Sequence, residues 1–194
     1  MKISITIPTY LHGPKLNCLL ESLLGQHNVT GTEWEAQVLH DGPPNVSFIQ
    51  TQGFYQQYPQ LTFKHTPYRF NVWGHDLTQT GLSMSTGDYW MRMNGDNQYC
   101  YGWLERVLPI LTREQPDILT WSCVHSYTEF SEFIPELIPG KIDFCNYLLK
   151  TDKAKQLGFP WRHFEADGAQ IEEFVKLYPN LKHIQMPNVL TIHN

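Results

Sequence analysis

The sequence predicts one α/β domain with a mainly parallel sheet and helices on both faces. Runs with a strand pattern alternate with runs of helical periodicity over most of the first 124 residues, and this order is typical of parallel sheets. The chain has 194 residues, a length that fits one domain with a sizeable apolar core. Hydrophobic residues make up 41% and charged residues 17%, which is ordinary globular composition.

The first strand and helix carry the clearest patterns. Ile3, Ile5 and Ile7 alternate with small polar residues and stop at Pro8, which predicts a strand. Leucines from residue 16 to residue 24 follow the i, i+3, i+4, i+7 spacing of an amphipathic helix that begins near Pro14.

The remaining elements follow in order along the chain. Strands are predicted at 35–40, 61–66, 88–93 and 117–124, and helices at 45–58, 75–86, from about 104 to before Pro116, and around 171–178. The aromatic and acidic run 125–139 breaks the alternation and predicts a loop or hairpin. Residues 181–194 predict a short strand or two.

Charge and cysteine usage narrow the class of partner. The formal net charge is −5 and there is no cluster of Lys or Arg, so nucleic acid is not an expected partner. The four cysteines are far apart without a CxxC pair, which favours reduced thiols in a cytoplasmic protein. No apolar run approaches the length of a transmembrane segment, and the first residues do not form a cleavable signal.

Polar residues follow three of the predicted strands. In parallel α/β sheets, ligands bind outside the carboxyl ends of the strands. Those ends carry Pro8-Thr9-Tyr10, Asp41-Gly42 and Asn94-Gly95-Asp96-Asn97. Each segment is also ordinary turn chemistry, and Asn-Gly is a strong hairpin signal. Each segment, taken alone, can therefore be interpreted either as a turn or as part of a binding site.

Three segments together resemble a known family. SITIPTYLHGPKLNCLLESLLGQ, VLHDGP and GLSMSTGDYWMRMNGDN are similar to successive blocks of family 2 glycosyltransferases with the GT-A fold. In that family a strand ends in P-T-Y or P-x-Y, and an Asp follows the second strand. Two spaced glycines, here Gly81 and Gly87, open and close the helix that comes before the strand leading to an acidic DxD motif. The resemblance implies one GT-A domain over 1–194, with a nucleotide-binding half at 1–100 and an acceptor and catalytic-base half at 101–194.

The resemblance implies a uridine nucleotide site. Pro8, Thr9 and Tyr10 would line the base, and Asp41 would accept a hydrogen bond from the uracil ring, which favours a UDP-sugar donor. The family usually carries an Arg-Asn pair ahead of the first spaced glycine. Thr and Gln stand there at 78–79, so the contacts to the diphosphate are not assigned by this block.

The resemblance also implies a metal, Mn²⁺ or Mg²⁺. Asn94, Gly95 and Asp96 occupy the DxD position: Asn94 would contact the ribose hydroxyls, and Asp96 keeps the carboxylate that divalent cations need. His193 matches the family's late histidine and would be a second metal ligand. A histidine in the shell favours Mn²⁺. An exposed terminal histidine is the alternative.

The block FEADGAQIEEFVKLYP resembles the family's segment that holds the catalytic base. Asp167 aligns best with this base, with Glu165 as the substitute. Such a residue would deprotonate an acceptor hydroxyl during an inverting transfer. Helix capping is the alternative, because an Asp at a helix start complements the dipole.

Other histidines and aromatics have less specific interpretations. We expect the remaining histidines, including His40, His75 and His163, to lie on the surface or in loops. An aromatic shelf for a sugar and ordinary core packing are both open for four side chains: Trp73, Trp121, Trp161 and Phe164. Trp161 is the first to test, because it is close to the candidate base.

The resemblance implies a glycosyltransferase of the hexosyl-transferring type (EC 2.4), and two other functions are alternatives. A sugar-phosphate nucleotidyltransferase needs a glycine-rich basic loop after the first strand, but LHGPKLN has one Gly and one Lys. A degenerate nucleotide- or carbohydrate-binding module would explain the replaced acids. The acceptor, a carbohydrate or another hydroxyl compound, is not identified. Its selection would be loose, or would come from the segment 125–165 or from a second subunit of a homo-oligomer.

Overall fold

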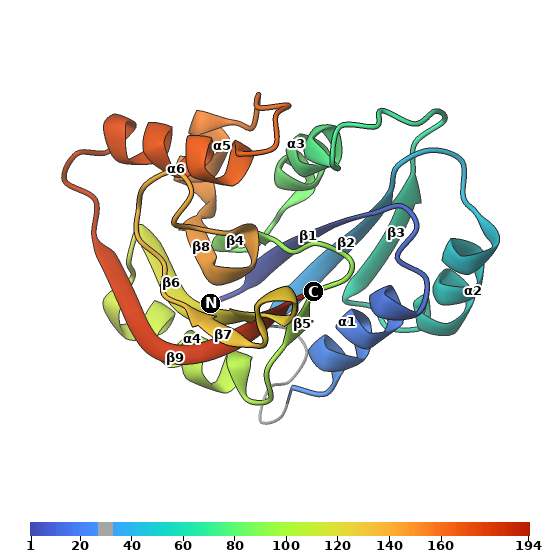
Figure 1. Cartoon of the computed structure of the whole chain (residues 1–194), viewed down its shortest axis with the longest axis horizontal. Coiled ribbons are helices and arrows are strands. Elements are labelled where there is room, and N and C mark those ends of the chain that lie inside the picture. Colours follow the sequence, from blue (N-terminus) through green and yellow to red (C-terminus); the bar gives the residue numbers. More distant parts are fainter. Residues whose placement is uncertain (27–32) are drawn as a thin grey trace.

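The computed structural model describes residues 1–26 and 33–194. Strands and helices alternate through the first half of the chain (Figure 1). Its elements are β1 (Ile3–Thr9), α1 (Pro14–Leu24), β2 (Trp34–His40), α2 (Val46–Tyr55), β3 (Leu61–His65), α3 (His75–Met84), β4 (Tyr89–Arg92) and β5 (Gln98–Tyr99). The second half contains α4 (Trp103–Glu114), β6 (Ile118–His125), η1 (Ser126–Thr128), β7 (Ser131–Phe133), η2 (Phe144–Asn146), β8 (Tyr147–Lys150), α5 (Thr151–Leu157), α6 (Ala166–Leu177) and β9 (His183–His193).

All the described strands belong to one sheet in the order β3-β2-β1-β4-β8-β6-β9-β5, with β7 beside β6. The pairings of β1 with β2 and β4, of β2 with β3, and of β6 with β9 are parallel. Because β8 is antiparallel to both β4 and β6, these two strands run in the same direction. Only β5, β7 and β8 run against the others. The predicted mainly parallel α/β sheet is confirmed.

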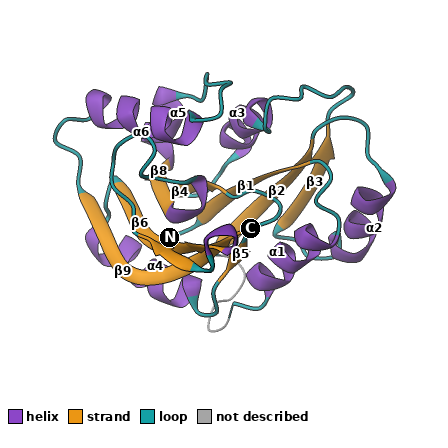
Figure 2. Cartoon of the chain, viewed as in Figure 1, coloured by secondary structure: helices purple, strands orange, loops and turns teal. Residues whose placement is uncertain are grey.

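Helices cover both faces of the sheet (Figures 1 and 2). One apolar cluster joins the isoleucines of β1 to α1, α2 and α4, and the other joins β8 to α3, α5 and α6. Every residue of β1 is buried, as expected for a strand covered on both faces. Within the described residues, no helix combines the length and apolar character needed to cross a bilayer.

The second half differs most from the sequence-based prediction. The run 125–139 contains β7, which pairs with the end of β6 and so forms the expected hairpin. Residues 183–193 form one long strand whose pairing with β6 shifts register near Trp121 and Ser122. The short elements β8 and α5 were not predicted. Gly81 lies inside α3 rather than at its start.

The Asn94-Gly95-Asp96-Asn97 segment is a turn but not a β-hairpin. The backbone N–H of Asn97 donates to the carbonyl of Asn94 at 3.1 Å. The strand that follows, β5, pairs with β9 and not with β4. The turn therefore leaves the carboxyl end of β4 free to face a ligand.

Candidate functional site

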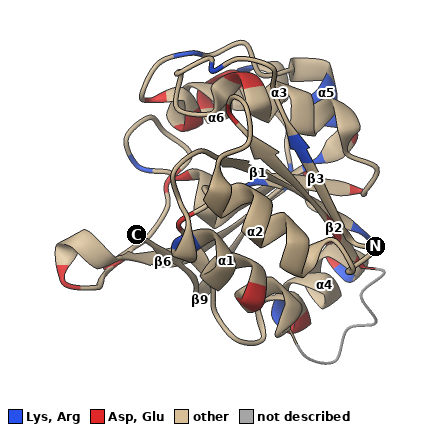
Figure 3. Ribbon diagram, turned by 90° about the vertical axis from the view of Figure 1, so that its right-hand side faces the viewer, with Lys and Arg blue, Asp and Glu red and all other residues tan. Residues whose placement is uncertain are grey.

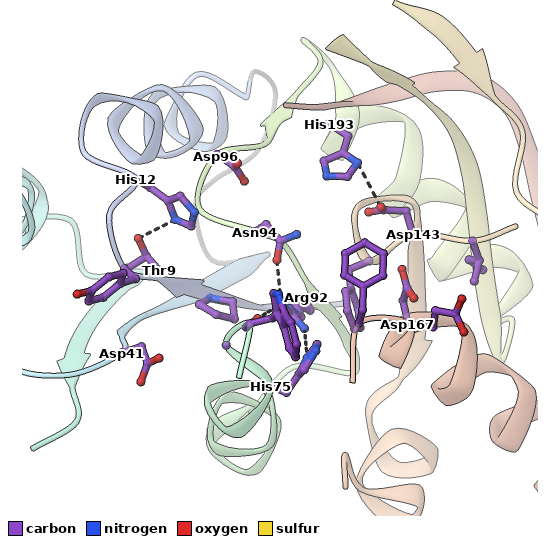
Figure 4. A pocket seen from close by; sticks show the side chains of 18 of the residues that line it. Thr9, His12, Asp41, His75, Arg92, Asn94, Asp96, Asp143, Asp167 and His193 are labelled. Atoms are coloured by element: carbon purple, nitrogen blue, oxygen red, sulfur yellow. Dashed lines mark hydrogen bonds and ion pairs between the residues drawn. The ribbon is translucent and has the colours of Figure 1, made fainter. Parts of the chain in front are cut away.

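A cleft of about 790 Å³ lies at the carboxyl ends of the parallel strands (Figure 4). Several strand ends contribute side chains to it, because strands that run in the same direction end at the same edge of the sheet. The contributing groups are Pro8 and Thr9 at the end of β1 with Tyr10 after it, Asp41 after β2, Arg92, Asn94 and Asp96 around the end of β4, His125 at the end of β6 and His193 at the end of β9. Asp143, Glu165 and Asp167 line it from the second half of the chain.

One end of the cleft is formed by Tyr10, Asp41 and Arg69. The Arg69 guanidinium lies 3.7 Å from the centre of the Tyr10 ring. The two carboxylate oxygens of Asp41 accept hydrogen bonds from the backbone N–H groups of Phe70 and Asn71, at 2.8 and 3.0 Å. Asp41 thus holds the loop after β3, and each of its oxygens keeps a lone pair that could accept another donor.

The turn after β4 brings two of its predicted residues to the cleft. Asn94 and Asp96 line it, but Gly95 does not. A Cβ at Gly95 would lie 2.5 Å from Nδ1 of His12, so glycine permits the turn to pack against the loop after β1. Asp96 is joined to the end of β9, because the amide of Asn194 donates to its carbonyl at 2.7 Å.

His193 belongs to a group that could hold a cation. The parallel register of β6 and β9 places His125 opposite His193, and Nδ1 of His193 lies 3.2 Å from Oδ2 of Asp143. One ligand atom from each of these three residues lies within 4.8 Å of the others. Burial lowers the pKa of His125, which favours its neutral, metal-binding form. Two imidazoles and a carboxylate suit Mn²⁺ chemically.

Asp167 lies in the first turn of α6 and faces the cleft. Burial, together with the nearby charge of Asp143, raises the pKa of Asp167 to about 6. Its Oδ1 accepts from the adjacent backbone N–H of Gly168 at 2.7 Å, so one oxygen serves the helix start. Glu165 also lines the cleft, exposed at the N-cap of α6 without a side-chain capping bond.

Arg92 is a functional candidate that the sequence analysis missed. Its side chain is 3% exposed and donates to three neutral acceptors: Nδ1 of His75 at 2.8 Å, the carbonyl of Trp73 at 2.7 Å and Oδ1 of Asn94 at 2.9 Å. Burial and the charge of Arg92 lower the pKa of His75 to about 4, so its ring is neutral and can accept. The available signal was a single charged residue inside the apolar strand YWMRM.

The structure separates the aromatic side chains into two groups. Trp73 and Phe164 are exposed and line the cleft, whereas Trp121 is fully buried in the core. Trp161, the first choice from sequence, packs edge-on against Phe159 and does not line the cleft.

The histidine expectation was wrong for two of the three residues named. His40 and His75 are buried, and only His163 is exposed. The sequence also gave no reason to single out His12, Arg69, His125 or Asp143, which line the cleft. Apart from Asp143, they follow predicted strands or lie close to them.

The fold and the cleft define an α/β domain built to bind a ligand at its strand ends. The sequence profile described as Glycosyl transferase family 2 matches residues 4–171. The chain therefore belongs to this family, and the expected enzyme class, glycosyltransferase (EC 2.4), is confirmed at the level of the family. No curated protein sequence matches the chain.

Solved structures confirm the GT-A fold. S. aureus TarS 1-349 is 18% identical, with a TM-score of 0.79 over 100% of this chain and 60% of its own. The complex of TarS 1-349 with UDP-GlcNAc is 16% identical, with a TM-score of 0.80 over 99% of this chain and 58% of its own. The mannosyltransferase PcManGT from Pyrobaculum calidifontis, in complex with GDP-Man and Mn²⁺, is 16% identical, with a TM-score of 0.78 over 99% and 56%. The chain thus spans less than two thirds of these structures.

Proposed function

We propose that the chain transfers a sugar from a UDP-sugar to an acceptor hydroxyl, with inversion at the anomeric carbon. The observation that carries this proposal is the position of Asp167, whose carboxyl group lines the same cleft as the strand-end residues. A nucleotide at Pro8, Thr9, Tyr10 and Asp41 would direct its sugar towards the acid. Family membership and the UDP-GlcNAc complex of TarS support a nucleotide-sugar donor.

Asp167 acts as the general base in this scheme. As the acceptor oxygen attacks the anomeric carbon, the bond to the nucleotide diphosphate breaks on the opposite face and the acceptor proton passes to the Asp167 carboxylate. A pKa of about 6 leaves this carboxyl ionised at neutral pH but more basic than an ordinary aspartate. Glu165 is the substitute base, although its exposed position makes it a weaker one.

Asp96 and His193 are proposed to hold a divalent cation, Mn²⁺ or Mg²⁺, with His125 and Asp143 beside His193 as further ligands. The close grouping of two imidazoles and a carboxylate fits Mn²⁺, which PcManGT also contains. When bound, such a cation would supply a Lewis acid for the departing diphosphate. Asn94 is proposed to contact the ribose, and Gly95 to set the position of the turn.

The first test is Asp167→Asn. Loss of the base is expected to lower turnover about 10²- to 10⁴-fold while UDP affinity stays within a few-fold of the wild type. Turnover would be followed by UDP release from a panel of UDP-sugars with Mn²⁺. Glu165→Gln is the matched control, since it removes a neighbouring carboxylate on the same helix start. Near-normal turnover of Asp167→Asn, with loss in Glu165→Gln, would move the base to Glu165.

The second test concerns the cation. Calorimetry is expected to show tighter UDP binding with Mn²⁺ than without it, and Asp96→Ala is expected to remove this gain because the carboxylate ligand is lost. Asp143→Asn is the companion variant, since its remaining oxygen can still accept from Cys145 N–H. If Asp143→Asn removes the gain and Asp96→Ala does not, the cation belongs with His125, Asp143 and His193.

The sugar and the acceptor are the open parts of the proposed reaction. Trp73 and Phe164, exposed at the cleft, offer apolar faces against which a sugar ring could pack. Because residues of the segment 125–165 line the cleft, we propose that this segment or a second subunit of a homo-oligomer forms the acceptor side. A panel of UDP-sugars and hydroxyl acceptors, scored by UDP release, would identify both.

A further inference from the structure

The guanidinium of Arg92 is a buried charge that lacks an ionic partner in contact. Among residues 1–26 and 33–194, its hydrogen-bond acceptors are an imidazole, a peptide carbonyl and a side-chain amide, and none of them is charged. The Phe144 ring also lies close to the guanidinium, with its centre 4.0 Å away. Burial lowers the pKa of Arg92 only to about 10, so the group stays charged at neutral pH.

A buried guanidinium without an ionic partner raises the free energy of the folded protein, and a bound anion would lower it. Removing a cation from water requires a free energy that neutral acceptors only partly offset. Two acids across the cleft, Asp167 and Asp143, act on Arg92 through space, and neither forms an ion pair with it (Figure 4). The protein therefore keeps a cation in the cleft wall without neutralising it.

The residue at position 94 maintains this state. Oδ1 of Asn94 accepts from Arg92 at 2.9 Å, so an aspartate there would form an ion pair with the guanidinium. The asparagine preserves the hydrogen bond and leaves the positive charge unpaired. Having Asn94 where the DxD motif has its first Asp therefore leaves the charge of Arg92 unpaired.

The α3 residues at the place of the family's Arg-Asn pair, Thr78 and Gln79, provide no cation. The hydroxyl of Thr78 donates to the carbonyl of Gly74 at 3.0 Å. Oε1 of Gln79 accepts from the backbone N–H of Phe159 at 2.6 Å. Both side chains are engaged in holding the fold, and Arg92 lies beside this helix start through its bonds to Trp73 and His75.

We propose that Arg92 is an anion-binding residue of the donor site, which takes an oxyanion of the sugar nucleotide. This inference rests on the proposed function. The oxyanion would be either the diphosphate or a carboxylate on the transferred sugar, and a planar guanidinium binds both. Free donors remain for this contact, because Arg92 has five N–H groups and the described residues accept from three.

The test uses Asn94→Asp, which inserts an anion beside Arg92 without changing side-chain shape. Calorimetry in buffer with EDTA would compare uridine, UDP, inorganic pyrophosphate, UDP-glucose and UDP-glucuronate. Asn94→Asp is expected to weaken binding of the anionic ligand about 10- to 100-fold and to leave uridine unchanged. Arg92→Met is expected to give the same pattern. Asn71→Asp is the matched control, since it adds the same charge at an exposed position of the same cleft without a bond to Arg92.

The ligands separate the two sources of the oxyanion. Weaker binding of UDP and pyrophosphate assigns Arg92 to the diphosphate, whereas weaker binding of UDP-glucuronate alone assigns it to a sugar carboxylate. Unchanged affinities in Asn94→Asp and Arg92→Met, or an equal loss for uridine, would overturn the proposal. If the wild-type protein binds pyrophosphate through Arg92 but binds no uridine compound, the UDP-sugar proposal fails and the anion site stands.

Discussion

The carboxyl group of Asp167 shows how position changes the chemistry of a side chain. Sequence analysis could name this residue from the block before the last helix, with capping as the alternative. In the structure, Oδ1 accepts from Gly168 N–H at the helix start and the side chain also lines the cleft, and its role as the base stays a prediction. Its raised pKa comes from burial and from Asp143, two causes that depend on the folded chain.

The pH dependence of the reaction should report this shift. Because the folded pKa of Asp167 is raised to about 6, the base is protonated below that pH and ionised above it. We expect kcat/KM to rise with pH through a midpoint near this value, as measured by UDP release between pH 4.5 and 8. Glu165→Gln should keep this acidic limb. A midpoint near 4, the value of an ordinary aspartate, would contradict the assigned environment.

Arg92, His125 and Asp143 could not be recognised from sequence, because only the folded chain brings them to the cleft. Arg92 ends a strand whose other residues are buried and mostly apolar, and no local pattern says that its head group meets a cleft. His125 becomes a candidate ligand only through its register with His193 on a distant strand. Asp143 lies in a stretch without a strand or helix period. Sequence could name the strand-end residues because sheet topology alone places them.

Close packing between α3 and β1 depends on a glycine within the helix. A Cβ at Gly81 would lie 2.2 Å from Cγ2 and Oγ1 of Thr6. Thr6 has little freedom to move, because its hydroxyl accepts from Nε1 of Trp90 at 2.9 Å. Gly81 therefore lets the helix rest directly on the central strand, which explains a glycine at a position where helix propensity opposes it.

Gly81→Ala is expected to destabilise the protein by about 1 to 3 kcal/mol through overpacking. For a chain of this size, each kcal/mol corresponds to roughly 2–4 °C in Tm. Gly53→Ala in α2 is the matched control, since a Cβ there meets nothing within 4 Å and helix propensity favours alanine. Thermal unfolding by circular dichroism would compare them. Equal Tm values for the two variants would contradict the packing argument.

Most of the elements could be predicted because their patterns are local. The alternating isoleucines of β1 and the leucine stripe of α1 specify buried faces by themselves. The elements β8 and α5 could not be recognised in this way. Both are short, and β8 is stabilised by pairing with β4 and β6, which are distant in sequence. The length of β9 was missed because a proline interrupts its pattern and its pairing is irregular.

At the scale of the molecule, ligand binding should raise thermal stability. A ligand at 100 times its Kd adds about 2.7 kcal/mol to the free energy of unfolding. UDP with Mn²⁺ is therefore expected to raise Tm by roughly 5–10 °C in a thermal-shift assay. GDP should shift Tm less, because the proposed contact of Asp41 is to uracil, and Asp41→Asn should reduce the difference. A GDP shift equal to that of UDP would contradict the uracil contact.

Charge over the whole molecule is mixed. Lys and Arg are interspersed with Asp and Glu along the ribbon in Figure 3. With a formal net charge of −5, the surface gives little general attraction for an anionic substrate. Recognition of a sugar nucleotide therefore depends on local groups in the cleft, where Arg69 and Arg92 are the Lys or Arg side chains among the described lining residues.

The position of β8 has a consequence for synthesis of the chain. The strand β4, which ends at the site, has β1 on one side and β8 on the other, and the partner residues of β8 begin near position 149. Until the ribosome has released that segment, β4 presents an unpaired edge, and such edges recruit other chains. A fragment ending near residue 100 would keep this edge permanently and should aggregate. The nucleotide-binding half, 1–100, and the acceptor half, 101–194, can therefore have separate roles in the reaction, but the first half needs β8 of the second in order to fold.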